Sequence, residues 1–183
     1  MEGLKEKYLL FKAQTFKDAD SYGAIYDRYV TRIYRFIYFK VGSEGDAEDI
    51  ASETFLKAWQ YIKEGQPIKN LNAFLYSIAR NLVIDHYRFQ AKKYEYEEVP
   101  IIEPQCNENL ADKLDIRKNE EKILASLKTL KNEYCEVIIL RFFDDLSVGD
   151  ISQIVGKSQN NTRVLIHRAL AALKRVAEAD NYE

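Results

Sequence analysis

The chain is poor in residues that interrupt helices or cross-link small folds. Of its 183 residues only three are proline, seven are glycine and two are cysteine. This composition excludes collagen-like, low-complexity and disulfide-scaffold proteins. The two cysteines and two histidines are too few for a structural zinc cluster, and so few cysteines suit a protein of a reducing compartment.

Long apolar runs and an excess of one charge are also missing. No stretch approaches the roughly 18 apolar residues of a membrane span, and the first segment, MEGLKEKYLLFKAQTFKDAD, is charged. We therefore expect no membrane insertion, no signal peptide and a cytoplasmic location. The 27 basic and 29 acidic residues give a net charge of −2, which argues against a free-standing nucleic-acid-binding protein. Residues 157–175 depart from this balance, with five basic residues and no acidic one.

Apolar residues recur at helical spacing along most of the chain. They follow the i, i+3, i+4, i+7 pattern over 47–62, and similar patterns cover 22–41 and 71–82. Ser43 with Asp46 predicts one helix start, and Asn70 or Asn72 predicts another. No segment alternates with period two for long enough to indicate a sheet. The pattern predicts an all-α fold.

The helical pattern fails between about Gln90 and Asp115. Residues 93–117 hold three basic and seven acidic residues, together with Pro100 and Pro104. This composition is typical of a flexible linker between domains. We therefore expect two small helical domains, residues 1–92 and 118–183, which fold independently and are joined by the acidic linker at 93–117.

The most specific local signal lies at 147–174. Ser147 and Asp150 predict a capping box that begins a short helix. Gly156 predicts its end, and Ser158 begins a second helix. This spacing is typical of a helix-turn-helix motif, whose second helix enters the DNA major groove. The side chains expected to contact DNA are Ser158, Gln159, Asn160, Arg163, Val164, His167 and Arg168. The alternative is an ordinary helical hairpin with a solvated basic face.

A second candidate surface lies on the helix predicted over 47–62. Asp49, Ser52, Glu53 and Leu56 share one face, opposite the face that bears Trp59. Carboxylates mixed with an exposed leucine suit a protein partner better than a metal ion, which requires converging oxygen ligands. The alternative is a solvated acidic helix start.

A third candidate surface lies on the helix predicted over 72–90. Asn81 and Arg88 share one face with Ser77 and Asp85, and the flank carries Tyr76, Arg80 and Tyr87. Aromatic rings interleaved with Arg and Asn suit an unpaired DNA strand, because bases stack on rings and cations follow the phosphates. The alternative is that the two tyrosines edge the core and that Arg80 pairs with a neighbouring acidic residue.

Signals for catalysis are absent from the sequence. There is no Ser-His-Asp arrangement, no glycine-rich phosphate loop and no metal-ligand spacing. We therefore expect no enzymatic activity, no metal site and no cofactor.

Three stretches together resemble a known family. DAEDIASETFLKAW (46–59), FLYSIARNLVIDHYR (74–88) and LRFFDDLSVGDISQIVGKSQNNTRVLIHRALAALK (140–174) resemble, in order, three elements of bacterial extracytoplasmic-function (ECF) sigma factors. These elements are the polymerase-binding helix, the strand-opening helix and the helix-turn-helix. The resemblance covers nearly the whole chain, from about Tyr8 to Val176. Each motif is moderately specific, and the three in this order are highly specific.

The resemblance implies a role for each surface. Residues 1–92 would be sigma region 2 and residues 118–183 sigma region 4, with promoter DNA and an anti-sigma factor as partners beside the polymerase. The face of Asp49, Ser52, Glu53 and Leu56 would bind the clamp helices of the largest polymerase subunit. The flap of the core polymerase would be a further contact of the chain. The minus-ten element would be held by Lys69, Asn70, Tyr76, Arg80, Asn81 and Arg88. The second helix of the helix-turn-helix would contact the minus-thirty-five element.

Two other classes of function remain open from the residues alone. One is a stand-alone helix-turn-helix transcriptional regulator whose amino-terminal half senses a signal or dimerises. The other is a helical adaptor with no role on DNA. A sequence-specific gel shift without polymerase would favour the first, and failure to bind promoter DNA even with core polymerase would favour the second.

Overall fold

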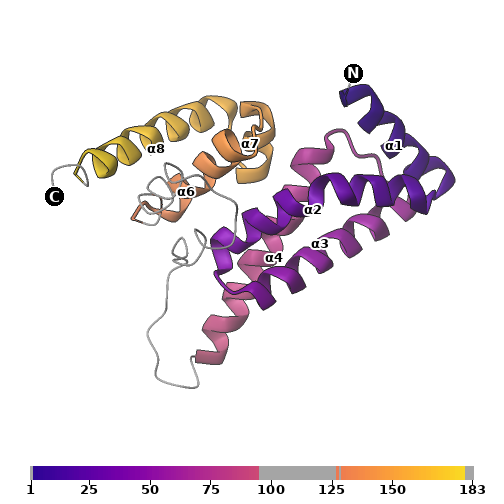
Figure 1. Ribbon diagram of the computed structural model, residues 1–183, viewed down its shortest axis with the longest axis horizontal. Helices are drawn as coiled ribbons and strands as arrows, with labels where there is room; N and C mark the ends of the chain where they lie inside the picture. Colours follow the sequence, from indigo (N-terminus) through magenta and orange to yellow (C-terminus); the bar gives the residue numbers. More distant parts are fainter. Residues whose placement is uncertain (1, 95–126, 128, 180–183) are drawn as a thin grey trace.

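The fold is described by a computed structural model, which covers residues 2–94, 127 and 129–179. Within these ranges it is built of helices and contains no strand, which confirms the predicted all-α class (Figure 1). The amino-terminal half comprises α1 (Glu2–Phe16), α2 (Ala19–Val41), α3 (Glu44–Lys63) and α4 (Leu71–Tyr94). The carboxy-terminal half comprises α6 (Asn132–Ile138), the π-helix η1 (Ile139–Phe143), α7 (Val148–Val155) and α8 (Gln159–Ala179). From residue 95 on, the predicted linker at 93–117 lies outside the described residues.

Local capping signals set the starts of α3 and α4 in the amino-terminal half. The Ser43 hydroxyl accepts a hydrogen bond from the Asp46 backbone N–H at 3.3 Å and begins α3. The Asn70 side-chain oxygen accepts from the Ala73 N–H at 3.1 Å, so Asn70 rather than Asn72 begins α4. Each side chain satisfies an N–H group that has no partner within the helix.

The core of the amino-terminal half lies between α2, α3 and α4. Its largest fully buried side chains include Tyr29, Phe36 and Tyr76, and the Phe36 and Tyr76 rings meet edge to face with centroids 5.2 Å apart. Helix α1 packs across α2 through Leu10 and Ala13, at the end of the bundle away from α8 (Figure 1).

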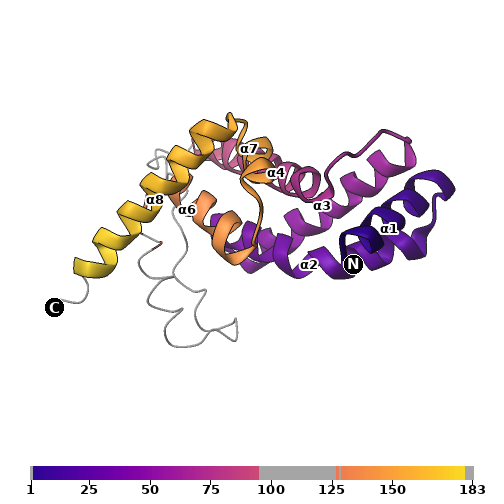
Figure 2. The same ribbon diagram turned by 90° about the horizontal axis from the view of Figure 1, so that it is seen from above.

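The carboxy-terminal half packs directly on the amino-terminal bundle. Helix α7 lies beside α4, and the Phe143 ring of η1 meets the Phe39 ring of α2 with centroids 6.1 Å apart. Helix α8 projects away from the bundle (Figure 2). The linker composition gives no indication of this contact. Independent folding of the two halves stays a prediction.

The helix that begins at Asn132 changes its winding after Ile138. The Asp144 N–H donates to the Ile139 carbonyl at 3.0 Å, an i to i+5 hydrogen bond of the π-helix. A regular α-helix would place Phe142 on the face that carries the buried Cys135 and Ile138. Phe142 is instead 54% exposed, in line with the wider turn of the π-helix.

Candidate protein and nucleic-acid interfaces

The predicted protein-binding face of α3 lies on the surface of the bundle. Leu56 is 56% exposed, and Asp49, Ser52 and Glu53 are exposed on the same side of the helix. Glu53 forms an ion pair with Lys57 at 2.9 Å. The opposite side of α3 packs into the core through Ala47, Ile50, Ala51, Phe55, Ala58 and Ile62. Burial of an exposed leucine against another protein is favourable, and charges around such a leucine can orient that protein, so this face is suited to a protein partner.

Helices α7 and α8 form the predicted helix-turn-helix. The Ser147 hydroxyl accepts from the Asp150 N–H, and the Asp150 carboxylate accepts from the Ser147 N–H, both at 3.1 Å. This is the predicted capping box. Gly156 ends α7 in the left-handed region at φ 67°, which favours glycine, and its N–H donates to the Ser152 carbonyl.

The outer face of α8 presents the predicted DNA-contacting side chains to solvent. Ser158 begins the helix, since its hydroxyl accepts from the Asn161 N–H at 3.2 Å. Arg163 donates to the Asn160 side-chain oxygen at 3.0 Å, so two of the predicted base-contacting groups touch each other. The exposed set is Ser158, Gln159, Asn160, Arg163, Val164, His167 and Arg168. The inner face packs through Leu165, Ile166 and Ala169, which are buried.

One part of the predicted strand-contacting surface is open. Asn81 and Arg88 of α4 are exposed, and Lys69 is exposed in the loop before α4. Arg88 lies 3.3 Å from the Asp85 carboxylate in an exposed pair. Such a pair contributes little to stability, so Arg88 is free to exchange its partner for a phosphate.

The other part of that surface is covered by the carboxy-terminal half. Tyr76 is fully buried, which agrees with the alternative of a tyrosine at the core, and its ring cannot stack on a base in this conformation. Arg80 is bound to Glu136 of α6 at 3.0 Å. The Asn70 amide donates to the Asp150 side chain of α7. Arg80 and Asn70 are engaged by α6 and α7, whereas the Tyr76 ring is buried within the amino-terminal core, against Phe36 of α2.

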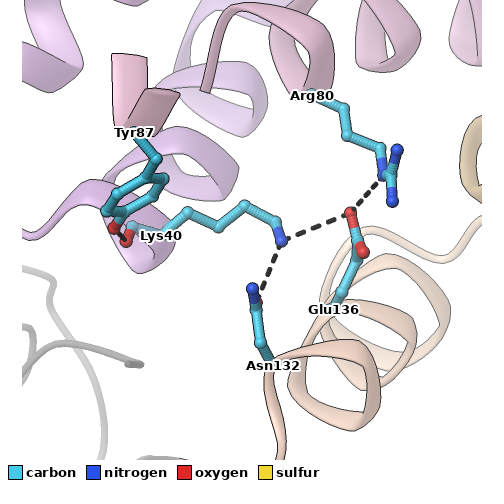
Figure 3. A network of polar contacts seen from close by, with 5 residues as sticks. All are labelled: Lys40, Arg80, Tyr87, Asn132 and Glu136. Carbon is cyan, nitrogen blue, oxygen red and sulfur yellow. Dashed lines mark hydrogen bonds and ion pairs between the residues drawn. The ribbon is translucent and has the colours of Figure 1, made fainter. Parts of the chain in front are cut away.

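A polar network joins the end of α2 and the middle of α4 to α6 (Figure 3). One oxygen of the Glu136 carboxylate lies 3.3 Å from the Lys40 ammonium and 3.0 Å from Arg80 Nε. Lys40 also donates to the Asn132 side-chain oxygen at 3.2 Å, and the Tyr87 hydroxyl donates to the Lys40 backbone carbonyl. Burial lowers the pKa of Lys40, and the charge of Glu136 opposes that shift.

A second ion pair joins α2 to the end of η1. Arg35 binds the carboxylate of Asp144, which is completely buried, and also donates to the Phe143 carbonyl at 3.0 Å. Burial raises the pKa of Asp144, and the Arg35 guanidinium opposes that shift. The negative charge of Asp144 adds to burial in raising the pKa of the Tyr76 hydroxyl.

Helical spacing alone did not single out Arg35, Lys40, Glu136 or Asp144 as members of a site. A local signal exists for two of them. Lys40 follows the apolar run Phe36–Phe39, and Glu136 interrupts a run that continues through Val137 and Ile138. A charge inside an apolar run predicts a buried ion pair, because a buried charge without a partner is strongly unfavourable.

Two properties of the described residues concern metal-ligand groups and helices that could span a membrane. In the described part of the chain, no three His, Cys, Asp or Glu side chains are grouped so that they could hold a metal ion. Among the same residues, no helix has both the length and the apolar character needed to cross a membrane.

Comparison with family models and curated relatives gives a consistent result. Residues 25–93 match the model of Sigma-70 region 2, and residues 120–173 match the model of Sigma-70 region 4. The ECF RNA polymerase sigma factor BldN of Streptomyces coelicolor is 31% identical over 168 residues, which cover 89% of this chain and 62% of BldN. SigW of Bacillus subtilis, also an ECF RNA polymerase sigma factor, is 28% identical over 172 residues, 86% of this chain and 89% of SigW.

Two solved structures share the fold. CnrH, in complex with the cytosolic domain of CnrY, superposes with a TM-score of 0.69 at 21% identity over 96% of this chain and 99% of CnrH. The sigma factor RpoE of Bartonella quintana, in complex with the anti-sigma factor NepR, has the same TM-score and identity over 86% of this chain and 97% of RpoE.

Proposed function

This chain belongs to the family of ECF RNA polymerase sigma factors, and we accordingly propose that it binds core RNA polymerase and directs it to specific promoters to initiate transcription. The observation that carries the proposal is the exposure of two surfaces on one chain. One is the α3 face around Leu56, within the region 2 match, and the other is the outer face of α8, within the region 4 match. The chain contributes binding energy and no catalytic group, and it acts in the cytoplasm.

Each surface has a proposed partner. The α3 face binds the clamp helices of the largest polymerase subunit, and the carboxy-terminal half lies near the flap. The outer face of α8 binds the minus-thirty-five duplex. Lys69, Asn81 and Arg88 bind the unpaired strand of the minus-ten element, and Asn70 and Arg80 join them once α6 and α7 have moved away. An anti-sigma factor is a further partner, in line with the complexes in which CnrH and RpoE were solved.

The proposal is tested by in vitro transcription. The purified chain and core polymerase are incubated with a genomic library, and the start sites are mapped. New start sites that share sequence elements upstream are expected. A stand-alone regulator is not favoured, because both regions match in the order of the family. It would instead give a sequence-specific gel shift without polymerase and no new start sites.

Arg163→Ala is expected to weaken promoters that have an intact minus-thirty-five element. Arg163 is exposed in the first turns of α8, where a guanidinium can bind a guanine bidentately. Loss of such a contact costs about 1–3 kcal/mol, or roughly 5- to 150-fold in promoter affinity. Filter binding of the holoenzyme to promoter DNA measures this loss of affinity. Arg175→Ala, an exposed arginine near the end of the same helix, is the matched control. Equal losses in both variants would contradict base contact by Arg163.

Asn81→Ala is expected to slow promoter opening and to leave duplex binding nearly unchanged. Asn81 is exposed on the open part of α4, and a lost hydrogen bond to an unpaired base is worth roughly two- to tenfold in rate. Permanganate footprinting of the start-site region measures the opening. A template with a pre-melted bubble should hide most of the defect. Equal opening by wild type and variant on the closed template would remove Asn81 from the strand-opening surface.

A further inference from the structure

Helix α1 carries apolar side chains on two opposite sides. On its inner side Leu10 and Ala13 are buried against α2. On its outer side Leu4, Tyr8 and Phe11 are 76%, 61% and 54% exposed, and their i, i+4, i+7 spacing places them in one line along the helix. A helix that is apolar all round is normally buried. The outer side of α1 is therefore expected to have a cover that the described part of the chain does not supply.

Leu4, Tyr8, Phe11 and Phe16 form this exposed surface, the α1 ridge. The Phe16 ring is 67% exposed and meets the Phe11 ring edge to face, with centroids 6.1 Å apart. Helix α1 lies at an edge of the bundle, away from α8 (Figure 1). It also precedes the region 2 match, which begins at residue 25, and none of the proposed polymerase and promoter surfaces includes it.

Lysines border the α1 ridge on both sides. At about 100° of rotation per residue, Lys5 and Lys12 lie on one side of the exposed line and Lys7 lies on the other. Lys5 and Lys7 are exposed to solvent. The Lys12 ammonium lies 5.9 Å from the centroid of the Tyr8 ring and 3.1 Å from the Asp18 carboxylate. The ridge is thus an apolar line between positive charges.

The carboxylate between these two exposed lysines in the sequence is turned away from the ridge. Glu6 accepts a hydrogen bond from the Tyr29 hydroxyl of α2 at 2.7 Å and lies 3.6 Å from Arg28 Nε. Its charge is therefore paired on the inner side of α1. Lys5 and Lys7 keep their positive charges on the side that faces solvent, so a partner of the α1 ridge should be apolar and negatively charged.

We propose that the α1 ridge binds the surface of an anionic lipid bilayer, with its apolar side chains inserted among the headgroups and Lys5 and Lys7 on the lipid phosphates. Aromatic and aliphatic side chains together with lysines are typical of helices that lie in the plane of a bilayer surface. Each lysine near an anionic surface adds attraction, and a tyrosine suits the headgroup level because its ring is apolar and its hydroxyl polar. The inference is independent of the proposed function.

Two other occupants fit the ridge less well. If two copies of the chain packed through their ridges, Lys5 and Lys7 of one copy would approach the lysines of the other, and like charges repel. A protein partner needs a recess shaped to the side chains that it covers. Leu4, Tyr8 and Phe11 each stand out from the helix by more than half of their surface, and such a convex line enters a layer of mobile headgroups without a preformed recess.

Co-sedimentation with lipid vesicles tests the apolar part of the ridge. The full-length chain should bind vesicles of equal parts phosphatidylcholine and phosphatidylglycerol, and bind vesicles of phosphatidylcholine alone much more weakly. Phe11→Gln is expected to weaken binding about tenfold or more, because a phenylalanine no longer leaves water. Phe89→Gln makes the same change at a side chain of α4 that is 72% exposed, and should bind as wild type does.

Circular dichroism checks that the variants keep their helicity. Should Phe11→Gln lose helicity, Leu4→Gln removes another apolar side chain of the same line and is expected to weaken binding by a similar factor. Equal binding by wild type and a folded ridge variant, or an equal loss in Phe89→Gln, would overturn the proposal.

A second arm tests the lysines. Lys5→Gln with Lys7→Gln is expected to weaken binding to the mixed vesicles roughly thirtyfold at low salt, about fivefold for each lysine. Lys157→Gln with Lys174→Gln removes two exposed lysines from the carboxy-terminal half and is the matched control. An equal loss in the control would mean that anionic lipid attracts every basic face of the chain, and would overturn the assignment to α1.

Insertion and the rival occupants have their own readouts. In Tyr8→Trp, the added fluorescence should shift to shorter wavelengths with the mixed vesicles, and an unchanged spectrum would contradict insertion. Sedimentation velocity without lipid should show a monomer. A dimer that Phe11→Gln dissociates would replace the bilayer by a second copy, and a folded monomer that binds no mixed vesicles would leave the ridge to a protein partner. Polymerase is absent throughout, so these outcomes are separate from failure of the proposed function.

Discussion

Replacement of Leu56 by Asp together with Glu53 by Lys is expected to abolish assembly of the chain with core RNA polymerase. Leu56 is 56% exposed and the helix beneath it is packed through its opposite side, so the change removes a partner contact without opening the core. Burial of an aspartate in place of the leucine leaves an unpaired charge in the interface. Loss of one central contact is worth about 2 kcal/mol or more, which is at least about thirtyfold in affinity.

Co-purification of tagged core polymerase with the variant, followed by size-exclusion chromatography, measures assembly. Leu4→Asp is the matched control, because Leu4 of α1 is also an exposed leucine, at 76%, and lies on another helix. It should assemble as wild type does. The circular dichroism spectra of the wild type, the Leu56 and Glu53 variant and Leu4→Asp should be the same. Normal co-purification of the Leu56 and Glu53 variant would show that polymerase binds elsewhere on the chain.

Phe36→Ala is expected to lower the free energy of unfolding by about 3–5 kcal/mol. Phe36 is fully buried at the centre of the bundle, where its ring meets Tyr76 edge to face and lies beneath the Lys40 ammonium. Its removal leaves a cavity between α2 and α4 that the surrounding helices fill incompletely. Since a whole domain is stable by only about 5–15 kcal/mol, the variant should be close to the limit of folding.

Urea denaturation followed by circular dichroism measures this loss. Phe89→Ala is the matched control: it makes the same chemical change on α4 at a side chain that is 72% exposed. Its effect should stay within about 0.5 kcal/mol. Similar losses for the two variants would mean that Phe36 does not anchor the core.

The two parts of the α4 surface call for different mutational experiments. Asn81 and Arg88 are exposed, so their replacement bears on DNA contact with little effect on the fold. Arg80 is tied to Glu136 in the free chain. Its replacement therefore changes the packing of the two halves as well as any DNA contact, and only the exposed positions report on strand opening by themselves.

The starts of α3, α7 and α8, and the inner and outer faces of α3 and α8, were predictable from the sequence. Ser43, Ser147 and Ser158 accept hydrogen bonds from backbone N–H groups three residues further on, a signal that depends on neighbours in the chain alone. The outer face of α8 was predictable for a similar reason. Buried Leu165 and Ala169 orient the helix, and the exposed polar side chains follow from its 3.6-residue period.

The surroundings of Tyr76 and Arg80 were not predictable in this way. Helical spacing assigns a residue to one side of its own helix but does not say which distant segment will cover that side. Arg80 meets its carboxylate 56 residues further along the chain, at Glu136. Which part of α4 is open and which is covered therefore depends on the packing of α6 and α7 against it, and that packing is set by buried apolar area and ion pairs formed between segments far apart in sequence.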